Sequence, residues 1–252
     1  IIAFRPFKLN PDNYVVVRSM KDIEANLRLS GDNNAALWIH SQAESDEMEE
    51  VHAELNQIDL GVISNAFSYI PPMKGILNAD FQYAPSDSAF MVVADMNIDD
   101  LYYENERVGE LMFNAVYLPL EQGNHQVDMH LFRDRKEVSA ITALYQMGET
   151  DHISGNIEFM HFPLDIANPF IPDDMAKMGG DLDGTLAISG QSDKPMAEGY
   201  LILDTASVYV GAAGSTFSFD DKKIEIKNNR ILFNQYGIYA YNKNPFIING
   251  EV

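Results

Sequence analysis

The chain has 252 residues, 46% of them hydrophobic and 22% charged, an apolar content that supports a folded core and excludes a disordered chain. Its formal net charge at pH 7 is −21, which argues against binding to nucleic acid or to an anionic membrane surface, because both attract Lys and Arg. Cysteine is absent, so neither a disulfide nor thiol chemistry is expected.

The chain contains no apolar run near the roughly 20 residues that a membrane helix needs. It begins with Ile1 and ends with Val252, with no initiator Met. We expect one continuous β domain over residues 1–252 that is a fragment of a longer protein, with any signal or anchor outside it.

The first clear strand signal is Ile23–Leu29, where apolar and polar residues alternate at a period of two. A turn at Gly31–Asn34 leads to a second expected strand over Ala35–His40. The acidic run Ala43–Glu50 predicts a solvated loop, because adjacent like charges repel one another, and a cation site is the alternative. The alternation resumes over Val51–Ile58.

The period then changes over Leu60–Ile70, where apolar residues fall at helical spacing until Pro71 and Pro72 end the segment. We expect a short amphipathic helix here. Alternation returns afterwards and predicts further strands, which we place at 75–83, 89–95, 111–118, 126–132 and 138–145.

A similar arrangement appears about a hundred residues later. Leu164–Met178 parallels the segment that begins at Leu60, and Gly180–Leu186 parallels Gly75–Phe81. The order of parts predicts a second short helix followed by a strand. It also predicts a tandem array with approximate repeat units 1–59, 60–163 and 164–252.

The last third, Gly180–Val252, consists of short alternating segments separated only by turn residues. Over the whole chain we count about a dozen strands in an antiparallel meander. A meander presents one continuous apolar face. That face is covered by another layer, folded upon itself, or left for an apolar ligand.

No catalytic or metal motif is present. Paired acids such as Asp99-Asp100 point to opposite faces of a strand, which does not suit a pair of catalytic carboxylates. Asp181-Leu-Asp183-Gly184 resembles the start of a calcium loop, but Ser192 stands where that loop ends on Glu. The histidines are scattered along the sequence. We therefore expect neither an enzyme nor a metal site, and no cofactor.

Several spaced motifs carry a resemblance to a known family. They are Gly180-x-Leu-x-Gly-x-Leu-x-Ile-x-Gly190, Pro195-x-x-x-Gly199-x-Leu-x-Leu-x-x-Ala206, Ile224-x-Ile-x-Asn-Asn-x-Ile-x-Phe233 and Asn244-Pro-x-x-Ile-x-Gly250-x-Val252. In order and spacing they resemble the C-terminal repeats of the TamB family, which belongs to the AsmA-like group of bridge-like lipid transfer proteins. The style of the turns also resembles members from Bacteroidetes.

The resemblance implies a long antiparallel meander curled into a U-shaped β-taco groove. We expect the two short helices to cap this groove, and the alternative is that they cover unpaired strand edges. It implies a Gram-negative periplasmic protein whose parent is anchored in the inner membrane by a segment outside this chain. Such proteins are linked to phospholipid transport and to the assembly of outer-membrane proteins, and they meet an Omp85-type partner in the outer membrane. We therefore expect this chain to shield and conduct phospholipid acyl chains between the two membranes and to support outer-membrane assembly. The expected ligand is a phospholipid or another molecule with acyl chains.

The apolar members of the alternating strands are the candidate lining of that groove. Their alternative interpretation is an ordinary filled core of a sandwich or barrel. The candidates are Ala25, Leu27, Leu29, Leu77, Phe81, Leu182, Leu186, Ile188, Leu201, Leu203, Ile224, Ile226, Ile231, Phe233, Phe246 and Ile248.

Two other functions stay open on the sequence. The first is a scaffold that helps to insert outer-membrane proteins by β-augmentation, in which a client strand pairs with an exposed sheet edge. The second, from another class, is a secreted β-sandwich that binds or cleaves glycans. Trp38 is the only tryptophan, which makes an aromatic sugar platform less favoured.

Overall fold

The structure is a computed structural model, and it describes residues 6–45, 48–67, 69–86, 89–104, 106–172, 174–240 and 244–252. Antiparallel β-strands, 17 in number, dominate these residues. The chain divides into two compact units, residues 1–135 and 136–252. The fold class that the sequence predicts, an all-β meander of the β-taco type with two short helices, is confirmed.

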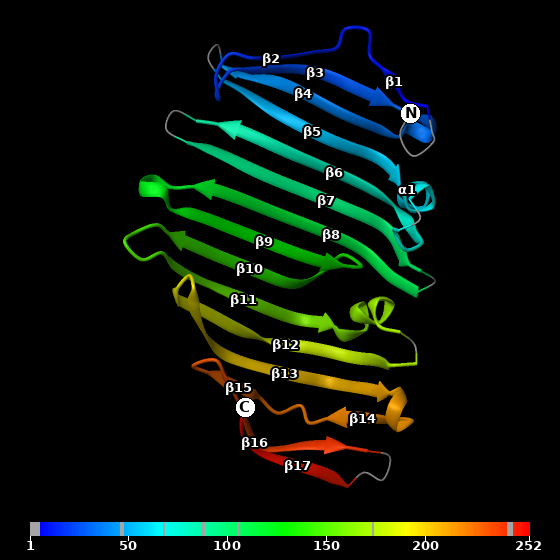
Figure 1. The fold of residues 1–252 in the computed structure, drawn as a ribbon, viewed down its shortest axis with the longest axis vertical. Helices are drawn as coiled ribbons and strands as arrows, with labels where there is room; N and C mark the ends of the chain where they lie inside the picture. The colour runs from blue at the N-terminus through cyan, green and yellow to red at the C-terminus, as the bar shows by residue number, and fades with distance from the viewer. Residues whose placement is uncertain are drawn as a thin grey trace. The chain divides into compact units, whose positions relative to one another are not determined.

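In the first unit the strands follow one another in chain order (Figure 1). From β2 to β8 each strand pairs with the next one, and β1 also pairs with β3. The elements are β1 Lys8–Leu9, β2 Tyr14–Val17, β3 Ile23–Ser30, η1 Asp32–Asn34, β4 Ala36–Ser45, β5 Met48–Asp59, α1 Leu60–Ala66, β6 Met73–Pro85, β7 Phe90–Tyr103, β8 Glu106–Pro119, η2 Glu121–Gly123 and β9 His125–Arg133.

The second unit continues the same plan from β10 to β13. β13 then pairs with both β14 and β15, which together lie along β16, and β16 pairs with β17. The elements are β10 Lys136–Gln146, β11 His152–Pro163, η3 Leu164–Phe170, β12 Ala176–Gln191, β13 Lys194–Val210, η4 Gly211–Ala213, β14 Ser215–Phe219, β15 Ile224–Lys227, β16 Arg230–Tyr239 and β17 Pro245–Glu251.

In several strands the extra residue of a β-bulge donates its backbone N–H to a side chain of the neighbouring strand, and we call this contact a side-chain lock. Gln57 adopts a left-handed backbone with φ 52°, and its N–H donates to Asn78 Oδ1 on the next strand at 2.9 Å. Gln235 has φ 51°, and its N–H donates to Asn249 Oδ1 at 2.8 Å. The extra residue of a bulge leaves its ladder position unpaired, so the amide oxygen supplies the missing acceptor.

The same lock occurs at His161, with φ 47°, whose N–H donates to Asp183 Oδ1 at 2.8 Å. Gln57 and His161 both lie three positions before a short helix, α1 and η3 respectively. The bulge, the helix and the following strand therefore appear in the same order in both units.

Each helix is also hydrogen-bonded through one side chain to the strand that follows it. Ser64 Oγ accepts the N–H of Met73 at 3.1 Å and donates to the Met73 carbonyl at 3.3 Å. Asn168 does the same with its amide, accepting the N–H of Met178 at 2.7 Å and donating to its carbonyl at 2.8 Å. These shared contacts match the internal parallel seen in the sequence, whereas the repeat boundaries 1–59, 60–163 and 164–252 stay predictions.

Both helices are shorter than the sequence suggests. α1 ends at Ala66 rather than near Ile70, after a start capped by Asp59 Oδ1, which accepts the N–H of Gly61 at 2.8 Å. The segment expected to be helical over Leu164–Met178 is a 3₁₀ helix only to Phe170, and β12 already begins at Ala176. Pro169 inside η3 has no N–H to donate, which disfavours a regular α-helix.

The expected acidic loop over Ala43–Glu50 is wrong for most of its length. β4 continues to Ser45, β5 begins at Met48, and these two residues pair. The remaining residues, 46–47, lie outside the described part. Pairing in a hairpin outweighs the local repulsion of like charges, because it satisfies the backbone groups of both strands.

Two glycines with a positive φ differ in how closely the neighbouring strand approaches them. At Gly199, with φ 149°, an added Cβ would lie 2.0 Å from the carbonyl oxygen of Thr185, whereas at Gly250, with φ 133°, it would meet nothing within 4 Å. We expect Gly199→Ala to lower the free energy of unfolding by about 3 kcal/mol or more. Gly250→Ala carries only the backbone strain, about 1–2 kcal/mol. Urea denaturation followed by circular dichroism measures both, and equal losses would contradict the close approach.

Candidate functional site: the apolar face of each unit

In the first unit one face of the sheet is apolar across seven consecutive strands. Side chains that face each other across a ladder lie on the same face, and every second residue along each strand returns to it. One cross-strand row, from β3 to β9, runs Leu27, Ile39, Ala53, Phe81, Ala94, Ala115 and Met129. The neighbouring row runs Leu29, Leu37, Leu55, Ala79, Met96, Phe113 and Leu131.

The opposite face of this unit is polar. The row between the two apolar rows runs Arg28, Trp38, Glu54, Asp80, Asp95, Asn114 and His130. Burial acts to raise the pKa of Glu54, but hydrogen bonds from Asn56 and His40 outweigh it and hold this pKa below its ordinary value. The sheet is therefore amphipathic, with one face suited to water and one to apolar groups.

The apolar face is not a densely packed core. The buried hydrophobic residues of the described part are few and mostly small: Ala25, Ala36, Leu60, Ala79, Leu101, Val108, Val138, Ala206, Ile224 and Tyr236. Phe81 lies in the middle of the first unit's sheet and is still 44% exposed. A closed sandwich buries most of its large apolar side chains, so this face belongs to a sheet that is open on its apolar side.

The second unit has the same amphipathic design with more glycine. Its apolar rows place a glycine between large side chains, as with Gly184 between Phe159 and Leu201. A longer row runs Ile141, Ile157, Leu186, Gly199, Ile226 and Ile231. An added Cβ at Gly184 would lie 2.2 Å from the carbonyl oxygen of Tyr200, so glycine here allows the neighbouring strand to approach closely.

A hollow of about 320 Å³ lies in the first unit where α1 meets the end of the apolar face. Leu55, Ile58 and Leu77 line it from the sheet, and Val62 and Ile63 line it from the helix. The size is at the lower end of the range for small-molecule sites. The helix thus extends the apolar surface at one end of the strands.

The second unit has its own apolar hollow, of about 390 Å³. Strands β13, β14, β16 and β17 supply most of the lining, which is Val208, Val210, Phe217, Phe219, Ile238, Ala240, Asn244 and Phe246. Phe246 is 71% exposed, so this hollow is open to solvent and accessible to a ligand.

All sixteen residues that the sequence singles out as groove lining lie on the apolar face of their own unit. In the first unit these are Ala25, Leu27, Leu29, Leu77 and Phe81. The remaining candidates belong to the second unit. Their contact with lipid stays a prediction. Sequence reasoning missed the helix residues of the first hollow, because an amphipathic helix does not reveal which surface it covers.

The family model described as TamB, N-terminal domain, matches residues 30–203, which is more than half of the chain. The chain belongs to the TamB family. No curated protein and no solved structure gives a match.

The matching description concerns the N-terminal domain of TamB, whereas the sequence motifs resemble the C-terminal repeats of the family. TamB membership indicates a protein of the bacterial envelope. In the described ranges of this TamB chain, no helix is long and apolar enough to cross a bilayer.

The corner beside the second hollow of this TamB chain depends on Asp220, which lies between β14 and β15. Its carboxylate accepts from Lys222 Nζ at 2.7 Å, from the N–H of Gly237 at 2.8 Å and from the hydroxyl of Tyr239 at 2.8 Å. The hydrogen bond from Lys222, followed by those from Tyr239 and Gly237, holds the pKa of Asp220 below its ordinary value despite partial burial. Burial and the charge of Asp220 raise the pKa of Tyr236 to about 12.

We expect Asp220→Asn to lower the free energy of unfolding at neutral pH by about 1–3 kcal/mol, since it removes the charge that three donors share. Because the pKa of Asp220 is lower in the folded chain than in the unfolded chain, its stabilisation is complete above about pH 4 and is lost as the pH falls through the folded value. The gap between the variant and the parent therefore closes in acid. Urea denaturation over a pH series measures it.

Asp221→Asn is the matched control, because Asp221 is the exposed neighbour of Asp220 and the substitution makes the same change in charge. Its effect should stay within about 0.5 kcal/mol at every pH. Equal losses for the two variants would show that general charge, rather than the Asp220 network, stabilises this corner.

Proposed function

We propose that this chain is a non-enzymatic periplasmic element that shields the acyl chains of phospholipids along its apolar face. In this proposal it forms part of a conduit between the inner and outer membranes and supports outer-membrane assembly. The observation that carries the proposal is the continuous apolar face of β3–β9, open to solvent at Phe81 and polar on its reverse side. TamB membership supports the envelope setting.

The physical basis is transfer of hydrocarbon out of water. Each CH₂ that leaves water contributes about 0.8 kcal/mol, so an apolar strip can hold acyl chains without specific polar contacts. Such binding grows with the length of acyl chain that is covered and does not depend on the head group, and it lets a lipid slide from one row to the next. The net charge of −21 opposes adsorption on anionic membrane surfaces, which leaves the apolar face as the surface that attracts lipid.

The wider setting also belongs to the proposal. The parent protein would be anchored in the inner membrane by a segment outside this chain, and it would meet an Omp85-type protein in the outer membrane. The motifs of Gly180–Val252 support a place among the C-terminal repeats, and the style of the turns supports a Bacteroidetes origin. The family resemblance is the support for each of these points.

Val92 and Val93 provide a matched test within one strand. Val92 pairs with Tyr83 and Tyr117 on the apolar face, whereas Val93 pairs with Gln82 and Val116 on the reverse face, and both are half-buried. A photo-crosslinking amino acid at position 92 of the full-length protein in cells should capture phospholipid. The same group at position 93 should capture little, since it points away from the apolar face. Mass spectrometry of the crosslinked products measures both.

Equal lipid capture from the two positions, or none from position 92, would contradict the proposal. Substitution by Arg adds a functional test, because a charge at Val92 interrupts the apolar row and a charge at Val93 does not. We expect Val92→Arg, and not Val93→Arg, to impair growth of cells that depend on the protein. Circular dichroism of both purified variants establishes that they fold.

A scaffold for outer-membrane proteins is the second candidate, and β17 favours it. Phe246 is 71% and Ile247 42% exposed on opposite sides of this strand, a surface that an added strand could cover. This function predicts crosslinks to unfolded barrel proteins from β17 rather than to lipid from β7.

A glycan-binding sandwich has less support. Trp38 is half-buried, its ring is stacked on that of His40 with 3.9 Å between the ring centroids, and the guanidinium of Arg28 lies over it.

A further inference from the structure

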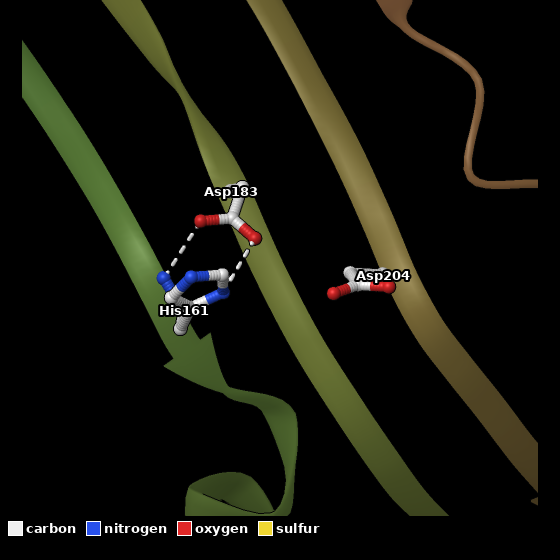
Figure 2. A group of neighbouring side chains, drawn as sticks. All are labelled: His161, Asp183 and Asp204. Carbon is white, nitrogen blue, oxygen red and sulfur yellow. Dashed lines mark hydrogen bonds and ion pairs between the residues drawn. The ribbon is translucent and has the colours of Figure 1, made fainter.

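Three side chains that are far apart in the sequence meet on adjacent strands of the second unit. Figure 2 shows His161 on β11, Asp183 on β12 and Asp204 on β13. One potential ligand atom from each lies within 4.8 Å of the others. His161 Nδ1 is 3.0 Å from Asp183 Oδ2, while the backbone N–H of His161 donates to Asp183 Oδ1 at 2.8 Å.

The bulge at His161 does not itself require these residue types. The equivalent bulges use a neutral pair, Gln57 with Asn78 and Gln235 with Asn249, and there too the amide oxygen accepts the backbone N–H. Of these three bulges, the one at His161 pairs an imidazole with a carboxylate, and both groups are metal ligands. The local fold thus explains the backbone contact and leaves the imidazole and the second carboxylate oxygen unexplained.

The local excess of negative charge also favours a bound cation. Asp204 lies directly across the ladder from Asp181, and like charges in opposed positions destabilise a sheet. Within the described ranges, no Lys or Arg forms an ion pair with Asp181, Asp183 or Asp204. A bound cation would relieve this repulsion.

We propose that His161, Asp183 and Asp204 form a binding site for a divalent transition-metal ion of the zinc class. Imidazole together with carboxylate oxygen suits Zn²⁺ better than Ca²⁺ or Mg²⁺, which favour oxygen ligands alone. Two ligands of a tetrahedral Zn²⁺ ion lie about 3.3 Å apart, close to the separation of the His161 and Asp183 donor atoms. The side chain of His161 is 75% exposed, so water completes the coordination.

The proposed ion lies beside two register shifts in the sheet of the second unit. The β11–β12 ladder shifts register between Phe159 and Phe162, and the β12–β13 ladder shifts between Gly179 and Asp181. A metal held by all three strands would join them where their backbone hydrogen bonds are interrupted. We therefore expect it to stabilise the second unit.

Titration calorimetry and thermal unfolding of the chain with ZnCl₂, in excess Mg²⁺ to occupy diffuse acidic sites, test the proposal. Zn²⁺ should bind with one ion per chain and raise the melting temperature. Asp204→Asn should weaken binding by roughly 10- to 100-fold. The double change His161→Gln with Asp183→Asn copies the Gln57–Asn78 pair, so it should keep the metal-free melting temperature and lose the response to Zn²⁺.

Asp193→Asn is the control, since Asp193 is exposed in a turn of the same unit and the substitution makes the same charge change. It should bind Zn²⁺ like the parent chain. The proposal is overturned if the parent shows no saturable Zn²⁺ binding. It is also overturned if the Asp204→Asn variant and the double variant bind as tightly as the parent, because the ion would then lie elsewhere on the acidic surface.

Discussion

The rest of the structure depends on keeping one set of side chains on one face of a long antiparallel array. A strand alternates its side chains with a period of two, so a slip of one residue would move its apolar set to the other face. The bulges preserve the phase. Leu55 and Ile58 both face the apolar side although they are three residues apart, because the extra residue Gln57 lies between them. The side-chain lock on that residue therefore maintains the amphipathic character of the sheet.

The same requirement accounts for the recurring parts of the two units. A bulge, a short helix that grips the next strand through Ser64 or Asn168, and a glycine with positive φ at Gly75 or Gly180 occur in the same order. Each part fixes the position of a strand relative to its predecessor without adding a second layer. An amphipathic sheet built in this way can lengthen by repetition and keep its apolar face open, which is what a function in shielding acyl chains requires.

In the second unit, one of the side-chain locks consists of residues that can also bind a metal ion. Where the neutral lock of Gln57 and Asn78 needs only an amide oxygen, His161 and Asp183 provide the same backbone contact and add two potential metal ligands. Asp204 on the next strand brings a third. The backbone contact of the bulge is the same in both forms.

The sequence determined the class of fold and the composition of its apolar face. Alternation at Ile23–Leu29 and over Gly180–Val252 predicted strands, and turn residues predicted where the chain reverses direction. Every groove candidate lies on the apolar side of its unit. These features follow from local geometry, since alternate residues of a strand share a face. The motifs also led to the TamB family, although to a different part of it from the one that matches.

Only the tertiary structure decided the features that depend on strand pairing. Pairing turned most of the acidic run at Ala43–Glu50 into a hairpin. It brought His161, Asp183 and Asp204 together although they lie in different strands, and it left Phe81 exposed in the middle of a sheet. Sequence period specifies which side a residue faces, but the register between strands decides which residues meet, and whether another layer covers them depends on the whole chain.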